Sequence, residues 1–273
     1  MTILDEITEH KKKQVAIRKQ QMDIKTLKSS HFFKNECLSL KHALKKSSFP
    51  GIIAEFKRKS PSKGIINNEA SAEVVAMGYC DAGAAGISVL TDDTFFGGSP
   101  NDLTQVRNFC PVPILRKDFI IDEYQIFEAK AIGADVILLI AAVLTKEELY
   151  HYTRTAKSLG MEILFEVHEE HELDKLNEEM DIVGVNNRNL KDFSVDIHTS
   201  VNLAEQIPSH YVKISESGIS HPDNLVKLHK SGFQGFLIGE TFMKEPMPHL
   251  AMDKYVKHPF KNHHFFTKGN DYF

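Results

Sequence analysis

Eight short apolar segments alternate with segments of helical pattern from residue 52 onward, and this alternation constrains the fold more than any other feature. The apolar segments are typical of buried strands and fall at residues 52–56, 86–90, 113–115, 135–140, 162–165, 182–185, 211–214 and 235–238. Helical patterns fill the intervals at residues 69–82, 103–109, 123–131, 146–159, 169–178, 197–206 and 222–230. Because a helical crossover returns the chain to a parallel strand, the pattern predicts an α/β fold, a single (β/α)8 TIM barrel.

An open, doubly wound sheet is the alternative arrangement of the same units. The turn after the first strand, however, lacks the glycine fingerprint of a dinucleotide-binding sheet, so we favour a barrel over residues 49–256. Residues 1–48 carry a loose apolar stripe and predict an N-terminal helical extension that packs across one end of the barrel. Residues 257–273 lack periodicity, and we expect a poorly ordered C-terminal tail.

Composition limits the partners and the compartment that we expect. The formal net charge of −4 gives no general attraction to nucleic acid or to an anionic membrane, so neither is expected as a partner. The N-terminus has no apolar signal core and the apolar run at 136–144 is too short to span a bilayer, which makes the cytoplasm the expected location. No helix or strand shows a surplus apolar stripe, and we expect a monomer.

The sequence gives no sign of a metal site or of a cofactor, and we expect neither. Cys37, Cys80 and Cys110 are scattered and match no metal or disulfide pattern. His168 and His171 enclose two glutamates, which is not the H-E-x-x-H spacing of a zinc site. We expect both histidines at the start of a solvated helix.

The stretch at residues 52–64, I-I-A-E-F-K-R-K-S-P-S-K-G, begins as an apolar strand and gains charge abruptly. Residues two apart on a strand share a face, so Ile53, Glu55 and Lys57 point one way and the residues between them point the other. An acid and a base side by side at a strand end are costly to bury unless a ligand uses them. A surface strand with an isolated ion pair is the alternative.

In a TIM barrel the active site lies where the carboxyl ends of the strands meet. Most of the predicted strands place a polar or charged residue there, and the set is Glu55, Lys57, Thr91, Lys117, Glu166, Asn186, Arg188, Glu216, Ser217 and Gly239. Each of these residues, taken alone, could simply belong to a solvated loop. Their convergence on one mouth predicts a catalytic site.

Glycines just beyond the last two strands predict a phosphate site. They stand in Ser217-Gly218 and Gly239-Glu240, each ahead of a helical segment. Barrels commonly bind phosphate with the backbone N–H groups of the loops after strands seven and eight. Ser60 and Lys63 of the first loop lie across from them in the predicted barrel. Helix-entry turns with capping side chains are the alternative interpretation.

Longer motifs surround these strand ends: residues 52–64 given above, S-V-L-T-D-D-T-F-F-G-G-S (88–99), P-I-L-R-K-D-F-I-I-D-E-Y-Q-I (113–126), I-L-F-E-V-H (163–168), V-G-V-N-N-R-N-L (183–190), I-S-E-S-G-I (214–219) and F-L-I-G-E-T-F-M (236–243). In them the sequence resembles the indole-3-glycerol phosphate synthase family of tryptophan biosynthesis. The resemblance covers most of residues 1–250. It departs at Thr241-Phe242, where the family usually has a small residue followed by Leu.

The resemblance implies a ring closure on a phosphorylated small molecule, 1-(2-carboxyphenylamino)-1-deoxyribulose 5-phosphate, with loss of CO2 and water. Lys117 matches the general acid at the substrate carbonyl, and Lys57 matches the lysine that contacts the substrate carboxylate and takes part in dehydration. Glu166 and Glu55 match the catalytic carboxylates, one of which serves as base. The remaining catalytic positions, which orient the substrate and the lysines, match Asn186 and Glu216.

The resemblance also implies the substrate-binding residues. Arg188 matches the arginine on strand six. The phosphate positions are matched by Ser60, Ser217, Gly218, Gly239 and Glu240, and the anthranilate pocket by Phe95, Phe119 and Leu138. Weak contact with neighbouring pathway enzymes stays open.

Three other functions stay open. A phosphate-binding barrel like phosphoribosylanthranilate isomerase would need a Cys/Asp acid–base pair, and the first strand has no cysteine. A Schiff-base aldolase would use Lys117 at its strand end. A catalytically silent barrel that acts as a binding or scaffold protein is the alternative from a different class.

Overall fold

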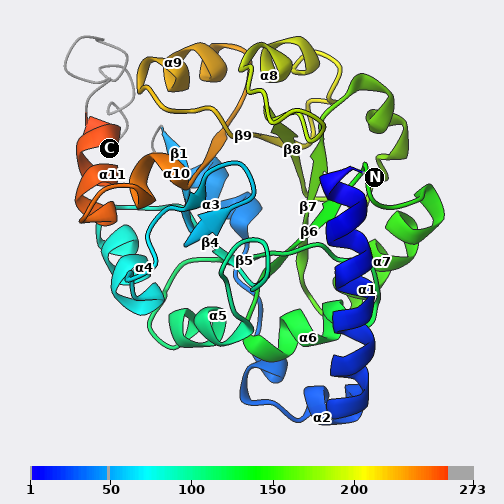
Figure 1. Cartoon of the computed structure of the whole chain (residues 1–273). Helices are drawn as coiled ribbons and strands as arrows, with labels where there is room; N and C mark the ends of the chain where they lie inside the picture. The colour runs from blue at the N-terminus through cyan, green and yellow to red at the C-terminus, as the bar shows by residue number, and fades with distance from the viewer. Residues whose placement is uncertain (1, 48–49, 258–273) are drawn as a thin grey trace, which may run out of the picture.

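Eight parallel strands close into a barrel in the order β1-β10-β9-β8-β7-β6-β5-β4 in the computed structural model, which describes residues 2–47 and 50–257 (Figure 1). They are β1 (Gly51–Phe56), β4 (Gly86–Leu90), β5 (Ile114–Lys117), β6 (Val136–Ile140), β7 (Glu162–Val167), β8 (Ile182–Asn186), β9 (Val212–Glu216) and β10 (Gly235–Ile238). Closure joins the first strand to the last, with Ala54 opposite both Ile87 and Ile238. The predicted TIM barrel is confirmed.

A ring of helices surrounds the strands in Figure 1. They are α4 (Ala72–Asp81), α5 (Pro100–Arg107), α6 (Tyr124–Ile132), α7 (Lys146–Ser158), α8 (His198–Leu203), α9 (Asp223–Lys230), α10 (Glu240–Met243) and α11 (Pro248–Lys257). The helix expected at 169–178 is instead a short 3-10 helix, η2 (Glu170–Lys175). The buried carboxylate of Glu172 accepts hydrogen bonds from the N–H groups of His168 and Glu169, which holds this segment tightly against the end of β7.

The strands are buried on both faces, as in other all-parallel sheets. Ile53 packs in a cluster inside the barrel with residues such as Leu138 and Leu164. Ala54 and Phe56 belong instead to the larger cluster between the strands and the helices. The alternation of faces predicted for the first strand is therefore confirmed, and it directs Glu55 and Lys57 toward the barrel axis.

The N-terminal segment forms α1 (Ile3–Gln21), α2 (Ile24–Lys28), η1 (His31–Lys34) and α3 (Leu40–Lys46). Leu40 and Leu44 of α3 close the amino-terminal end of the barrel, where glycines leave room for them. A Cβ on Gly86 would lie 2.6 Å from Leu40 Cδ1, and one on Gly235 would lie 2.9 Å from Leu44 Cδ2. Helix α1 packs along α6, and its first turns reach the opposite, carboxyl-terminal end. The segment thus contacts both ends of the barrel, where we expected one.

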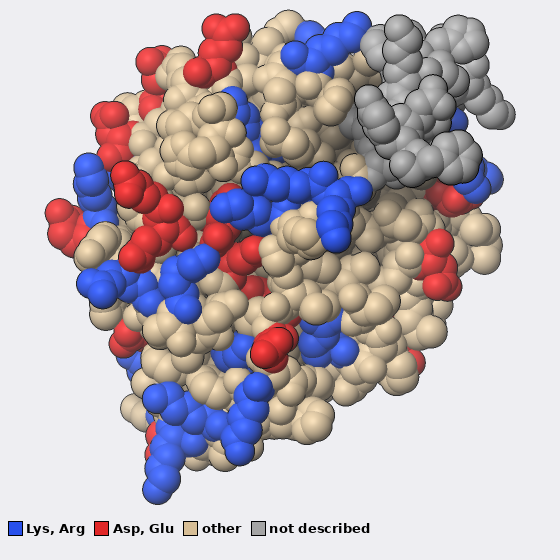
Figure 2. Space-filling model, turned by 180° about the vertical axis from the view of Figure 1, so that it is seen from behind, with Lys and Arg blue, Asp and Glu red and all other residues tan. Residues whose placement is uncertain are grey.

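The first β-to-α loop contains a small hairpin, β2 (Lys59–Ser60) and β3 (Gly64–Ile65), that the sequence did not suggest. The predicted C-terminal tail lies outside the described residues except for Lys257, the last residue of α11. Within residues 2–47 and 50–257, no helix is both long and apolar enough to cross a membrane. Basic and acidic side chains are mixed over the face in Figure 2, in keeping with the small net charge of −4.

Candidate active site

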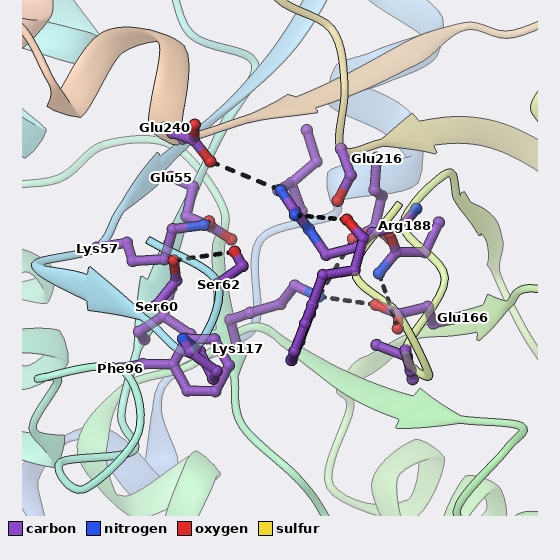
Figure 3. A pocket seen from close by; sticks show the side chains of 18 of the residues that line it. Glu55, Lys57, Ser60, Ser62, Phe96, Lys117, Glu166, Arg188, Glu216 and Glu240 are labelled. Atoms are coloured by element: carbon purple, nitrogen blue, oxygen red, sulfur yellow. Dashed lines mark hydrogen bonds and ion pairs between the residues drawn. The ribbon is translucent and has the colours of Figure 1, made fainter. Parts of the chain in front are cut away.

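A cavity of about 430 Å³ opens where the carboxyl ends of the barrel strands meet. It collects side chains from loops and strands that are far apart in the sequence (Figure 3). All but two of the predicted site residues line it: Glu55, Lys57, Ser60, Lys63, Lys117, Phe119, Leu138, Glu166, Asn186, Arg188, Glu216, Ser217, Gly218, Gly239 and Glu240. The exceptions are Phe95 and Thr91.

Lys117, the last residue of β5, lies at the centre of the charged part of the cavity. Its Nζ lies 2.7 Å from Glu166 Oε2 and 3.1 Å from Glu216 Oε2. Burial acts to lower the pKa of Lys117, but the carboxylates of Glu166, Glu216 and Glu55 outweigh burial and hold the pKa above its ordinary value. The amine is therefore a charged ammonium, able to donate a proton but not to act as a nucleophile.

The two carboxyl groups beside Lys117 differ in their protonation. Burial acts to raise the pKa of both. For Glu166 the nearby charge of Lys117 and the amide of Asn186 prevail and lower the pKa. For Glu216 burial prevails, with repulsion from Glu166, and raises the pKa to about 8. One carboxylate and one protonated carboxyl group around a shared ammonium give the site both an acceptor and a donor near neutral pH.

Gly184 on β8 leaves the space that Glu216 occupies. A Cβ at Gly184 would collide with Oε1 of Glu216 and lie 3.0 Å from Leu164 Cδ1. Within the described part of the chain, that Oε1 is buried without a hydrogen-bond partner. The missing side chain at Gly184 thus allows Glu216 to fold over the barrel core and still reach Lys117.

Glu55 and Lys57 form a second acid–base pair across the cavity. Lys57 Nζ lies 2.7 Å from Glu55 Oε1, and both side chains are largely buried. Gly239 at the end of β10 makes room for this carboxylate, because a Cβ there would lie 2.6 Å from Glu55 Oε1. Gly184 within β8 and Gly239 just after β10 therefore each make room for one buried glutamate.

The loops after β9 and β10 form a polar pocket beside these pairs. Ser217 and Gly218 have φ angles of 66° and 71°, a left-handed turn that directs successive N–H groups to one side. Asn187 stabilises this turn, because its amide donates to the carbonyl oxygens of Glu216 and Ser217. The turn and the start of α10 face Ser60 of the first loop across the cavity.

Arg188 and Lys63 place positive charge at the same pocket. Both approach the carboxylate of Glu240. Arg188 Nη2 lies at 3.6 Å (Figure 3), and Lys63 Nζ lies at 3.8 Å. At these distances the ion pairs are loose. An anion that enters the pocket therefore finds two cations that are only weakly engaged.

The opposite side of the cavity is apolar. Phe119 and Leu138 line it as predicted, but Phe95 does not, and its neighbour Phe96 takes that place with its ring 6.1 Å from Phe119. The reason is local: Asp92 accepts a hydrogen bond from the Phe95 N–H, and the Phe95 ring turns toward His10 of α1. The expectation for Phe95 was wrong by one position.

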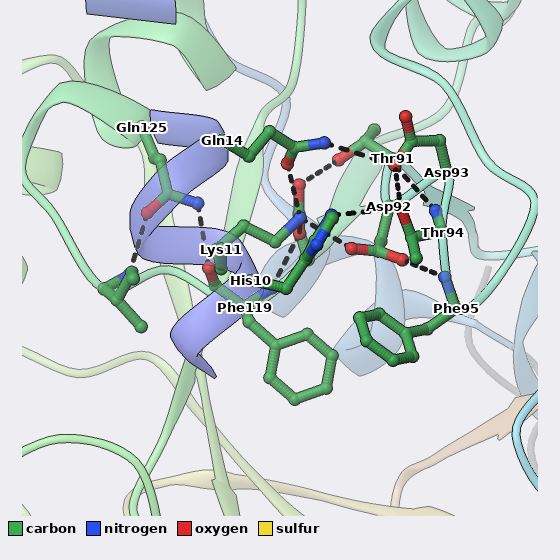
Figure 4. Close-up of polar contacts among 12 residues, drawn as sticks. His10, Lys11, Gln14, Thr91, Asp92, Asp93, Thr94, Phe95, Phe119 and Gln125 are labelled. Atoms are coloured by element: carbon green, nitrogen blue, oxygen red, sulfur yellow. Dashed lines mark hydrogen bonds and ion pairs between the residues drawn. The ribbon is translucent and has the colours of Figure 1, made fainter. Parts of the chain in front are cut away.

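Helix α1 supplies part of the cavity wall, which the sequence did not predict. Ile3, Leu4 and Ile7 line the cavity. The helix is fixed by Lys11, whose fully buried ammonium lies 2.7 Å from Asp92 (Figure 4) and 2.8 Å from Asp118. The available signal was spacing: Lys11 lies four residues from both Ile7 and Val15, on the buried face of the helix, whereas the two lysines that follow it do not.

Two further expectations need correction. Thr91 does not reach the cavity, because it is buried below it and donates to Asp118 Oδ2. His168 is not solvated: its side chain is only 10% exposed, and its Nε2 lies 3.4 Å from Glu166 Oε1. His171 is exposed, as expected. The strand alternation of Glu166 and His168 was the available signal for the inward direction of His168.

Solved structures share this fold at low sequence identity. The 3-hexulose-6-phosphate synthase of Salmonella typhimurium superposes with a TM-score of 0.60 at 14% identity, over 76% of this chain and 98% of that chain. A mutant tryptophan synthase alpha-subunit of Pyrococcus furiosus gives a TM-score of 0.57 at 15% identity, over 76% and 96%. These similarities support the barrel alone.

Sequence comparison is more specific. The family model of Indole-3-glycerol phosphate synthase matches residues 4–254. The indole-3-glycerol phosphate synthase of Bacteroides thetaiotaomicron is 48% identical over 255 residues, which cover 93% of this chain and 98% of that protein. That of Salinibacter ruber is 42% identical over 257 residues, covering 93% and 95%. The chain belongs to the indole-3-glycerol phosphate synthase family, the carboxy-lyases of tryptophan biosynthesis that act on a phosphorylated small molecule.

Proposed function

We propose that this cavity converts 1-(2-carboxyphenylamino)-1-deoxyribulose 5-phosphate into indole-3-glycerol phosphate, CO2 and water, with Lys117 as the general acid of ring closure. The observation that carries the proposal is the buried ammonium of Lys117 held between Glu166 and Glu216. Ring closure develops negative charge on a ketone oxygen, and a buried ammonium both stabilises that charge and supplies the proton. A Schiff-base aldolase, by contrast, needs a neutral amine, which the raised pKa of Lys117 disfavours.

The later steps need a second acid and a base. CO2 leaves when the electron pair of its bond restores the aromatic ring, so no electron-sink cofactor is required. Dehydration then removes a hydroxyl group and a ring hydrogen. We assign Lys57 to the substrate carboxylate and to proton transfer at dehydration, with Glu55 or Glu166 as the base. Their short contacts, 2.7 Å for each lysine–glutamate pair, support this assignment.

The substrate's two ends match the two sides of the cavity. The phosphate would bind the N–H groups of Ser217, Gly218, Gly239 and Glu240 with the Ser60 hydroxyl, and Arg188 adds positive charge there. The anthranilate ring would pack on Phe119 and Leu138, with Phe96 in the place expected for Phe95. Asn186 and Glu216 would orient the substrate hydroxyls and the lysines between these ends.

The chain contains no tryptophan, which makes the test direct. Indole fluorescence that appears when the purified protein meets the substrate can come only from product. We expect such a rise with the wild type and its loss in Lys117→Met. A folded wild-type protein that binds inorganic phosphate but produces no fluorescence would contradict the proposal.

We also propose that the protein acts as a monomer in the cytoplasm and that contact with neighbouring pathway enzymes is weak. The composition and the mixed surface charge support this. Sedimentation velocity over a range of protein concentrations tests it, and a stable dimer at micromolar protein would contradict it.

A further inference from the structure

The proposed reaction consumes one proton in each turnover. The ketone oxygen takes one proton as the aryl carbon bonds to the carbonyl carbon. The carbon–carboxylate bond then breaks, and CO2 leaves without a proton. The hydroxyl group takes a second proton and leaves as water, while the base recovers one from the methylene carbon that becomes part of the ring. The buried acidic groups therefore lose one proton in each turnover. Solvent must return this proton while substrate or product occupies the opening of the cavity.

Glu166 connects the reaction cavity to a different part of the protein. One oxygen, Oε2, accepts from Lys117 at 2.7 Å (Figure 3). The other, Oε1, lies 3.3 Å from Asn186 Nδ2 and 3.4 Å from His168 Nε2. The two carboxylate oxygens thus contact the proposed acid on one side and a histidine on the other.

His168 does not line the reaction cavity but a second one, of about 360 Å³, next to it. Glu166 lines only the first cavity, and Asn186 and Arg188 line both. The second cavity reaches solvent, because Glu169 and Lys191 in its wall have side chains 56% and 76% exposed. His168 thus lies between the two cavities: it belongs to the wall of the second one, and its buried Nε2 lies 3.4 Å from Glu166 in the wall of the first.

The His168 ring has an acidic group on each side. Nδ1 lies 3.8 Å from Glu172 Oε2, opposite the Glu166 contact of Nε2. Within the described residues neither ring nitrogen has a hydrogen-bond partner. An imidazole that accepts a proton at one nitrogen can release one from the other, which is the property of a proton shuttle.

We propose that His168 carries protons from the second cavity to Glu166, which passes them to Lys117 between turnovers. This inference rests on the proposed function. A proton from the second cavity reaches Nδ1 by way of the Glu172 carboxylate, which lines that cavity and lies 3.8 Å from Nδ1. The proton on Nε2 then moves to Glu166 Oε1, and Glu166 protonates the neutral amine of Lys117. No bond other than those to hydrogen changes. His168 contacts neither substrate nor reacting atom, so it acts through Glu166.

Charged groups surround this path on every packed element. Glu166 on β7, Lys117 on β5 and Glu172 of η2 face it from within the protein. Glu169, Arg188, Lys191 and Asp196 line the second cavity. The ring itself lies between two acidic groups, with Glu166 beside Nε2 and Glu172 beside Nδ1.

The other carboxyl groups of the site offer no such route. Glu216 directs its second oxygen into the barrel over Gly184. Glu55 and Lys57 line only the cavity that the substrate fills. His168 contacts Glu166, the ion-pair partner of Lys117, and also lines the second cavity.

The test compares single and multiple turnovers of His168→Asn with those of the wild type, followed by indole fluorescence. The first turnover uses protons already on the enzyme, so with enzyme in excess the rate should stay within about twofold of wild type. With substrate in excess, kcat of the variant should fall roughly tenfold or more below that of the wild type. The ratio kcat/KM should stay at the wild-type value, because it depends only on the steps up to the loss of CO2. The deficit should widen as pH rises, and added imidazole should restore kcat.

The matched control is His171→Asn, an exposed histidine three residues later, which should behave as wild type. His168→Gln is a second variant that removes the imidazole. A histidine that only positions Glu166 would give a lower single-turnover rate and no rescue by imidazole, and this would overturn the relay, as would an unchanged kcat. A wild type that produces no indole would instead refute the proposed function.

Discussion

Lys11 and Asp118 form an ion pair of 2.8 Å in which neither side chain is exposed. Asp118 directly follows Lys117, so the pair fixes helix α1 to the segment that carries the proposed general acid. Asp92 lies 2.7 Å from the same ammonium, and Arg116 contacts Asp118 from the other side. Burial acts to raise the pKa of Asp118, but Lys11 and Arg116 hold it well below its usual range.

Replacing Lys11 with Met should destabilise the protein by about 3–5 kcal/mol, because it leaves Asp92 buried without its cation. Urea unfolding followed by circular dichroism measures this change. The control is Lys12→Met, which removes an exposed pair with Glu9 and should cost at most about 1 kcal/mol. Equal losses in the two variants would show that the buried pair does not hold α1 in place.

Lys117→Met should lower kcat by roughly 10²–10⁴, the usual contribution of a general acid. The comparison variant is Lys63→Met, at the rim of the polar pocket near Glu240. Removing this cation should raise KM and leave kcat close to wild type. Steady-state indole fluorescence measures both, and a Lys117→Met enzyme with wild-type kcat would refute the assignment.

The sequence was sufficient for the barrel and for most of the site because both follow from strand periodicity. Once eight parallel strands are recognised, their carboxyl ends must surround a common mouth, and this places the strand-end residues Lys117, Glu166 and Glu216 together without any contact information. The inward direction of Glu55 and Lys57 followed in the same way from a period of two.

What the sequence missed depends on where separate segments meet. Lys11 is buried only because α1 lies against the loops that carry Asp92 and Asp118. The choice between Phe95 and Phe96 depends on one hydrogen bond to Asp92 in a turn without periodicity. His168 looked solvated beside two glutamates and a histidine, but a 3-10 helix folded back on it.

Glu216→Gln should flatten the dependence of stability on pH between about 4.5 and about 8. The pKa of Glu216 is raised from 4.5 to about 8 in the folded protein, so the folded state binds more protons than the unfolded state in this window. The contribution of Glu216 to the free energy of unfolding is therefore present in full below pH 4.5 and is lost as the pH rises through 8. A glutamine cannot titrate, and the variant should lack this loss.

The measurement is the difference in unfolding free energy between Glu216→Gln and wild type at several pH values. Glu9→Gln, at an exposed helical position, should keep the wild-type slope. A difference that stays constant from pH 5 to pH 8 would mean that Glu216 is ionised throughout, and that Lys117 is flanked by two full charges.

Gly184→Ala should lower kcat by roughly ten- to hundredfold while the barrel stays folded, because the new Cβ collides with Glu216 Oε1 and displaces the carboxyl group from Lys117. Its other neighbours are side-chain atoms at 3.0 Å and 3.4 Å, which need to move by only a few tenths of an ångström. A double-mutant cycle separates the two effects. If Gly184 is needed to make room for Glu216, then Gly184→Ala should not lower kcat any further in a Glu216→Ala background. If Gly184 is needed for the packing of Leu164 and Ile214, then Gly184→Ala should lower kcat by the same factor in both backgrounds.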